Sequence, residues 1–171
     1  AGVKYILNEI KKIKYDSYIF SKGGFSKLNS KYKVCPNKVG SYNWYASALF
    51  VSKLIDNVIV IDFGSTTCDF SIIKNGKILN RRTSDINGML TKELLYTGCA
   101  RTPIYAHISE IRFRKKIYNI IPENFSSMSD VNLILGKLKK QDIYSKSSDG
   151  SSHSLLQSYK RISRSFGFDY D

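Results

Sequence analysis

The sequence is poor in the residues that bind metals through sulfur or imidazole. Three of its 171 residues are cysteine and two are histidine. Cys35, Cys68 and Cys99 stand far apart with no C-x-x-C pair, and His107 and His153 are distant from them in sequence. This pattern argues against a structural zinc site. An odd number of isolated thiols suits a reducing compartment, so we expect a cytoplasmic protein.

Long apolar runs are also missing. No run approaches the roughly 20 residues needed to cross a bilayer, so we expect no membrane association. The first residues, Ala1-Gly-Val-Lys-Tyr-Ile-Leu7, include no initiating Met and do not form a signal peptide. The 42% hydrophobic and 13% aromatic content is that of a globular domain with a sizeable core. We interpret residues 1–171 as a single partial domain, from the middle and C-terminal part of a longer protein.

Acidic residues are scarce relative to basic ones. There are 14 Asp and Glu against 27 Lys and Arg, a net charge of +13. Such an excess can indicate binding to nucleic acid or to an anionic membrane. The basic residues are scattered, however, and their densest groups, at 11–14, 112–116 and 137–140, form no long block. We therefore do not expect nucleic-acid binding as the main function, although a non-enzymatic basic interaction module remains an alternative.

The most informative stretch runs from Val58 to Ile73. The apolar, β-branched run Val58-Ile-Val-Ile61 is too short for a helix and predicts a buried strand. A second apolar run ends at Asn75-Gly76, a strong hairpin signal, and a third strand is expected over residues 77–80. The motif between the first two strands is D-x-G-S-T-T-x-D, from Asp62 to Asp69.

This motif has the chemistry of a phosphate site. Gly64 lets the backbone approach a ligand closely because it has no Cβ. Ser65, Thr66 and Thr67 add hydroxyl groups beside backbone N–H groups, which can form an anion-binding nest. Asp62 could hold a divalent cation bridged to the phosphates. The alternative is a polar hairpin turn between two solvated carboxylates, but the full motif between two apolar strands favours the phosphate site.

Other patterns predict the surrounding elements. Apolar spacing predicts helices over residues 2–14, 41–55, 85–95, 123–138 and 155–166, and strand pairs within residues 18–28 and 108–121. In the second of these helices, Trp44 beside Asn43 is interpreted as a packing anchor, with substrate contact as the alternative. The loop over residues 96–105 is rich in hydroxyls, and its Arg101 could bind a phosphate or carboxylate bidentately. Two roles remain open for this loop: contact with a ligand, or a purely structural turn of the chain.

Taken in order, these motifs resemble a known family. The residues that carry the resemblance are Asn43-Trp44, Asp62–Asp69, Glu93–Gly98 and Arg101-Thr-Pro103, with support from Met128-Ser-Asp130, Leu135-Gly136, Asp149-Gly150 and Arg161–Arg164. They are similar to the hydantoinase/oxoprolinase-like branch of the acetate kinase, sugar kinase, heat-shock protein 70 and actin superfamily. Within that branch they look like the synthases of methanofuran biosynthesis, also called tetrahydromethanopterin-linked one-carbon transfer pathway proteins. The resemblance covers nearly the whole chain.

The resemblance implies a fold. It is an α/β fold of the actin-like ATPase (ribonuclease H-like) type, with a mixed sheet flanked by helices. The family's first phosphate loop, rich in Gly and Asp, would precede Ala1, so the fold would be incomplete and would supply one wall of a cleft. The strand–loop–hairpin motif at 58–80 would be the second phosphate loop.

The resemblance also implies a reaction. It is the transfer of an aminomethylfuran group from its diphosphate to a tyramine phenol, which forms an ether and releases pyrophosphate. By this resemblance Asp62 would hold Mg²⁺, Arg101 would neutralise the leaving group, and both would be catalytic. Phosphate binding would fall to Gly64, Ser65, Thr66, Thr67 and Asp69, and the substrate cleft would be lined by Asn43, Trp44, Tyr96, Thr97, Gly98 and Thr102. The alternative is an ATP-dependent kinase or a hydantoinase/oxoprolinase-type amidohydrolase of the same superfamily.

Overall fold

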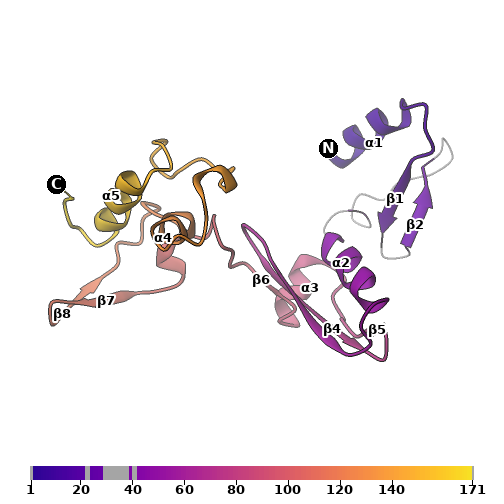
Figure 1. Cartoon of the computed structure of the whole chain (residues 1–171), viewed down its shortest axis with the longest axis horizontal. Coiled ribbons are helices and arrows are strands. Elements are labelled where there is room, and N and C mark those ends of the chain that lie inside the picture. The colour runs from indigo at the N-terminus through magenta and orange to yellow at the C-terminus, as the bar shows by residue number, and fades with distance from the viewer. Residues whose placement is uncertain (1, 22–23, 29–38, 40–41, 171) are drawn as a thin grey trace. The chain divides into compact units, whose positions relative to one another are not determined.

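The computed structural model describes residues 2–21, 24–28, 39 and 42–170 (Figure 1). The chain divides into two compact units. The first unit contains residues 1–62 and 69–94, and the second contains residues 63–68 and 95–171. The polypeptide therefore passes from one unit to the other three times, and the turn of the predicted phosphate motif belongs to the second unit.

The first unit begins with a helix and a hairpin. Helix α1 (Gly2–Lys11) precedes strands β1 (Tyr18–Ser21) and β2 (Gly24–Lys27), which pair antiparallel with Ile19 opposite Ser26. The predicted helix and strand pair are confirmed, although the helix ends before the predicted residue 14. An apolar cavity of about 240 Å³ is lined by Val3, Ile6, Leu7, Ile10, Tyr18, Ile19, Leu28 and Val39.

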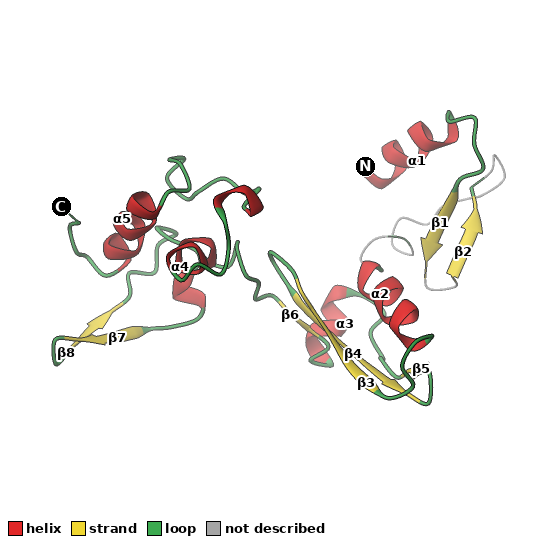
Figure 2. Cartoon of the chain, in the orientation of Figure 1, coloured by secondary structure: helices red, strands yellow, loops and turns green. Residues whose placement is uncertain are grey.

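The main sheet of the first unit is built on two hairpins (Figure 2). Its order is β3 (Val58–Phe63), β4 (Cys68–Lys74) and β5 (Lys77–Ile78), and β6 (Leu94–Leu95) also pairs with β4. The predicted Asn75-Gly76 turn is confirmed, because both residues have positive φ, 51° and 68°. Such left-handed conformations match the twist of a two-residue hairpin.

The prediction that β3 is buried is wrong. Its residues alternate, with Val58 and Val60 half-buried while Ile59 is 63% and Ile61 is 60% exposed. Across the sheet, Ile72 is also half exposed. A strand is buried on both sides only when layers cover both faces of its sheet, and no described element of the first unit covers this face. Apolar composition alone did not distinguish a strand buried on both faces from a strand buried on one face.

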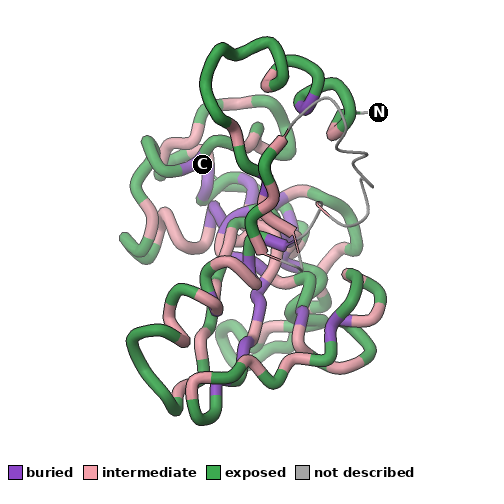
Figure 3. The backbone as a smooth tube through the Cα atoms, turned by 90° about the vertical axis from the view of Figure 1, so that its right-hand side faces the viewer, coloured by how far each residue is buried: buried purple, intermediate pink, exposed green. Residues whose placement is uncertain are grey.

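The opposite face of the sheet carries the core of the first unit. Helix α2 (Asn43–Ser52) contributes Trp44, which is 4% exposed, and Ala48, which is fully buried, and Ile73 and Leu94 are each 2% exposed. Figure 3 colours the backbone by burial, with buried residues in purple. The predicted packing role of Trp44 agrees with this burial.

Helix α3 (Asp85–Leu90) is shorter than predicted. The Ser84 side chain caps it by accepting a hydrogen bond from the Asn87 N–H, as its sequence suggests. The helix was expected to continue through Leu95, but Leu94 and Leu95 form β6 instead. The Phe70 N–H, on β4, donates to the Glu93 carbonyl at 2.9 Å. Pairing with the sheet therefore overrides the helical spacing of these leucines.

The second unit contains a hairpin and two packed helices. Strands β7 (Glu110–Phe113) and β8 (Lys116–Asn119) pair antiparallel, which confirms the predicted strand pair. Helix α4 (Met128–Ile134) packs against α5 (Leu155–Ser165), and two 3-10 turns, η2 (Ile104–Ala106) and η3 (Lys140–Asp142), lie in the connections. Helix α4 begins five residues later than the predicted start at residue 123, because the Ser127 N–H donates to the Asp130 carboxylate and caps the helix there.

A buried ion-pair network joins these two helices. Arg161 on α5 is 0% exposed and donates from Nε and Nη2 to Oδ1 of Asp130 on α4, at 2.9 and 2.6 Å. The Ser158 hydroxyl donates to the same oxygen at 2.8 Å. Arg161 Nη1 reaches the loop before α5, where it contacts Asp149 Oδ1 at 3.2 Å and Ser151 Oγ at 2.7 Å. One guanidinium thus connects α4, α5 and this loop.

The structure as a whole is mixed α/β with antiparallel strand pairs. The fold class is therefore confirmed at that level, and the actin-like fold stays a prediction. Among the described residues, no helix is both long enough and apolar enough to cross a bilayer.

Removal of the buried guanidinium should destabilise the second unit. We expect Arg161→Met to lower the free energy of unfolding by about 3–5 kcal/mol, because it leaves the Asp130 carboxylate buried without its partner. Urea unfolding followed by far-UV circular dichroism measures the change. The matched control is Lys160→Met, an exposed neighbour on the same helix. Equal unfolding midpoints for the two variants would contradict this account.

The same network predicts a pH dependence of stability. Burial raises the pKa of Asp149, but hydrogen bonds from the Ser151 side chain and backbone, the charge of Arg161 and a hydrogen bond from Ser147 outweigh it and lower that pKa from 3.8 to about 2. The stability that the ionised form contributes is therefore complete above the unfolded-state pKa and is lost as the pH falls toward the folded-state value. We expect Asp149→Asn to be less stable than the parent at about pH 6 and to approach it at about pH 2.5. Asp169→Asn, at an exposed carboxylate, is the control; a stability difference between Asp149→Asn and the parent that stays constant with pH would argue against the mechanism.

Candidate functional site

The turn of the predicted phosphate motif and the loop after β6 lie together in the second unit. The turn closes on itself through the Gly64 N–H, which donates to the Thr67 carbonyl at 2.9 Å. The Gly64 carbonyl accepts from the Cys99 N–H at 3.0 Å. The Ser65 carbonyl accepts from the N–H groups of Ala100 and Arg101 at 3.3 and 2.8 Å. The structure thus brings together two segments that are more than thirty residues apart in sequence.

Gly98 allows this close approach. A Cβ placed on Gly98 would lie 2.5 Å from the Ser65 carbonyl carbon and 2.5 Å from the Thr66 amide nitrogen. The Gly98 N–H donates to Thr102 Oγ1 at 2.7 Å, and Thr102 itself is 7% exposed. These two predicted cleft residues are therefore buried, and their contacts hold the loop against the turn.

The polar groups that remain at the surface have the chemistry of an anion-binding set. Arg101 is exposed, and its Nη2 donates to Ser65 Oγ at 3.3 Å. A guanidinium has five N–H donors in a planar fork that matches phosphate oxygens, and the bond to Ser65 takes one of them. Ser65 Oγ lies 3.5 Å from Thr66 Oγ1. A cation and two hydroxyl groups thus converge, whereas the Gly64 N–H is already used inside the turn.

A cavity of about 210 Å³ opens beside this set. It is lined by Ser65, Ala100, Arg101, Asp142, Tyr144 and Ser145. The first three residues belong to the predicted segments. The other three come from η3 and the chain that follows it, a stretch to which sequence analysis assigned no role. No local pattern marked them, because only tertiary contact brings them to the turn.

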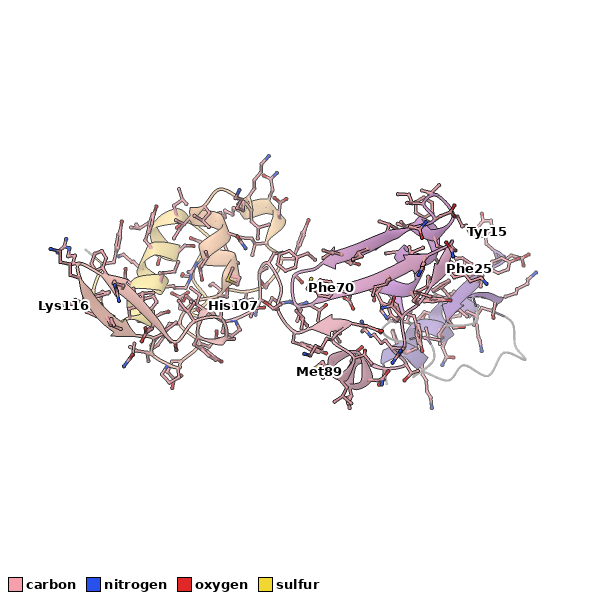
Figure 4. The ribbon with its side chains drawn as sticks, turned by 90° about the horizontal axis from the view of Figure 1, so that it is seen from below. Tyr15, Phe25, Phe70, Met89, His107 and Lys116 are labelled. Atoms are coloured by element: carbon pink, nitrogen blue, oxygen red, sulfur yellow. The ribbon has the colours of Figure 1, made fainter. Side chains whose placement is uncertain are left out.

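Two further predicted cleft residues lie just before Gly98. Tyr96 is 55% exposed, and Thr97 Oγ1 lies 3.2 Å from Nε2 of His107, the residue labelled in Figure 4. His107 directly follows η2, and sequence analysis gave it no role. Its contact with Thr97 ties the end of η2 to the loop that carries Arg101.

Other predicted site residues belong to the first unit. Asp69 is 8% exposed and is ion-paired to Arg82, whose guanidinium lies 5.1 Å from the centre of the Trp44 ring and also pairs with Asp85 at 2.7 Å. Asp69 and Trp44 are thus members of a buried cluster around Arg82. Asn43 stands exposed at the start of α2.

Asp62 is the predicted metal ligand, and it lies half-buried near the end of β3. The described residues contain no group of three or more His, Cys, Asp or Glu side chains placed to hold a metal ion. Mg²⁺ in phosphate sites is typically held by one or two carboxylates together with substrate phosphates and water. A single carboxylate fits Mg²⁺ only in that form, with the substrate supplying the other oxygens.

The Gly98 contact leads to a prediction. We expect Gly98→Ala to lower the free energy of unfolding by about 1–3 kcal/mol, because the added methyl group would force the loop away from the turn. Gly64→Ala is the matched control, since its Cβ would meet only the Thr67 carbonyl oxygen at 3.4 Å, an ordinary contact. Thermal unfolding of the two variants tests this. An unfolding temperature of Gly98→Ala equal to that of the parent would show that the two segments are not held at this distance.

Comparison with known proteins identifies relatives. A family described as Hydantoinase/oxoprolinase matches residues 1–164. A protein of Methanocaldococcus jannaschii named "(4-{4-[2-(gamma-L-glutamylamino)ethyl]phenoxymethyl}furan-2-yl)methanamine synthase" is 32% identical over 165 residues, which are 95% of this chain and 50% of that protein. A Methanococcus vannielii protein of the same name is 37% identical over 118 residues, 68% of this chain and 53% of that protein.

These matches show the family of the chain and how much of its relatives' length it covers. The chain spans about half the length of the curated relatives it matches. The resemblance inferred from the motifs of residues 43–44, 62–69 and 93–103 is confirmed by the family match, which includes all of these segments. The chain belongs to the hydantoinase/oxoprolinase family, and its relatives in two methanogens are synthases named for a furan methanamine.

Proposed function

We propose that the protein acts, in its full length, as a transferase of methanofuran biosynthesis that joins an aminomethylfuran diphosphate to a tyramine phenol and releases pyrophosphate. The observation that carries the proposal is the convergence of Arg101, Ser65 and Thr66 beside a cavity that Arg101 and Ser65 line. The relatives' names, which describe a phenoxymethyl-furan ether, support the choice of reaction.

The reaction makes one main electrostatic demand. The phenol oxygen forms a bond to the furan methylene carbon, the bond from that carbon to the diphosphate oxygen breaks, and pyrophosphate leaves with the electron pair while the phenol loses its proton. Negative charge therefore grows on the leaving group. Fixed donors aimed at such charge are the largest source of rate acceleration in many enzymes.

The residues of the second unit meet this demand. The Arg101 backbone is held by its hydrogen bond to Ser65, so its guanidinium is presented beside the turn at little entropic cost. The Ser65 and Thr66 hydroxyl groups can donate to further phosphate oxygens. Asp62 belongs to the first unit; there it would hold Mg²⁺, which stabilises negative charge on phosphate oxygens.

Replacement of the Arg101 guanidinium tests the proposal. We expect Arg101→Met in the full-length protein to lower kcat by about 10²–10³, because the leaving group loses a charged donor. Pyrophosphate release and ether formation, measured together from the diphosphate and the phenol, follow the loss. Arg112→Met, at an exposed arginine on β7, is the control.

Two results would count against this function. One is ether formation at the parental rate by Arg101→Met. The other is a wild-type protein that hydrolyses ATP in the presence of a kinase or hydantoinase substrate but forms no ether. Circular dichroism of each variant separates loss of the guanidinium from loss of the fold.

A further inference from the structure

The cavity beside Arg101 has two chemically different sides. One side is the anion-binding set, with Ser65 and Arg101. The other side is lined by Asp142, Tyr144 and Ser145. A phosphate ester would satisfy Arg101 but would be repelled by Asp142. The second side therefore needs a different chemical group.

The second side is built and held in place. Asp142 ends η3, and its Oδ2 accepts a hydrogen bond from the Lys139 N–H at 3.2 Å. The next residue, Ile143, is 8% exposed and anchors the segment in the unit. Nε2 of His153 lies 2.8 Å from the Ser145 carbonyl oxygen. Because a carbonyl only accepts hydrogen bonds, this nitrogen carries the proton and donates it.

Burial of Ile143 leaves its two neighbours at the surface. Asp142 is exposed, and Tyr144 is 94% exposed. An aromatic face and a carboxylate side by side are the usual means of recognising an organic ammonium, through a cation–π contact and an ion pair. The cavity volume of about 210 Å³ is below the roughly 300–1,000 Å³ of pockets that hold drug-sized ligands. It suits a single small ring with its substituents.

We propose that Asp142 and Tyr144 bind the ammonium-bearing furan end of the diphosphate substrate, while Arg101 and Ser65 bind its phosphate end. This inference rests on the proposed function, and the methanamine in the relatives' names is the primary amine concerned. The two opposite charges of the cavity select a ligand that carries an anion and a cation on one flat ring. Asp142 and Tyr144 thus determine specificity for the aminomethylated furan over neutral furans.

A binding experiment tests the inference without requiring turnover. The probes are [5-(aminomethyl)furan-3-yl]methyl phosphate and (5-methylfuran-3-yl)methyl phosphate, which have the ring substitution of the relatives' names and differ only in the amine, and calorimetry gives their Kd values with the full-length protein. We expect the amine probe to bind about fivefold more tightly, the size of a solvent-accessible ion pair. Asp142→Asn should remove this preference and leave the Kd of the methyl probe unchanged, because Asn keeps the oxygen that caps η3.

Matched variants sharpen the result. Glu110→Gln removes an exposed carboxylate of the same unit that does not line the cavity, and it should keep the full preference. Tyr144→Phe should keep the aromatic contribution, whereas Tyr144→Ala should weaken the binding of the amine probe by about twofold to fivefold.

Each of the opposite outcomes overturns the inference. A preference for the amine that survives in Asp142→Asn would show that the ammonium binds elsewhere. If Asp142→Asn weakens the binding of both probes equally, and does so only when Mg²⁺ is present, Asp142 is a metal ligand instead. Failure of the proposed function gives a different result. In that case the wild-type protein forms no ether and releases no pyrophosphate in the turnover assay, whichever probe binds more tightly in calorimetry.

Discussion

The hydrogen bonds between residues 64–65 and 99–101 are the contact on which the candidate site depends. Two carbonyl groups of the turn accept three N–H groups of the loop. This pairing, made possible by the missing side chain of Gly98, places Arg101 beside the Ser65 hydroxyl. A guanidinium on a free loop would have to be ordered by its ligand, at a cost in affinity. Here the backbone hydrogen bonds order the loop before any ligand binds. The cavity beside Arg101 depends on this arrangement of the loop.

The polar interior of the second unit supports the other side of that cavity. Arg161 connects α4, α5 and the loop at Asp149, and His153 in the same connection holds the Ser145 carbonyl. Removing one member of a buried ion pair is costly, whereas replacing the whole pair by apolar side chains often is not. We interpret the network as a device that specifies one arrangement of this connection. The cavity wall at Asp142 and Tyr144 depends on that arrangement.

The first unit shows which structural features local sequence patterns predict and which they do not. Its hairpins were predictable, because turn residues such as Asn75-Gly76 act within a few positions of the chain. The burial of β3 was not, since the exposure of Ile59 and Ile61 depends on what covers the sheet. The same limit applies to Leu94 and Leu95, whose helical spacing was outweighed by pairing with β4. Asp69, placed by its motif among the phosphate residues, lies in the buried cluster around Arg82.

The sequence by itself determined the family, the order of most helices and strands, and the two segments that carry Gly64–Thr67 and Arg101. These properties follow from turn chemistry and apolar spacing, which act over short stretches of chain. Only the tertiary structure decided that the two segments share a set of hydrogen bonds and that Asp142 and Tyr144 stand beside them. The physical reason is that these contacts join residues that are tens of positions apart, and their geometry depends on packing that no local pattern encodes.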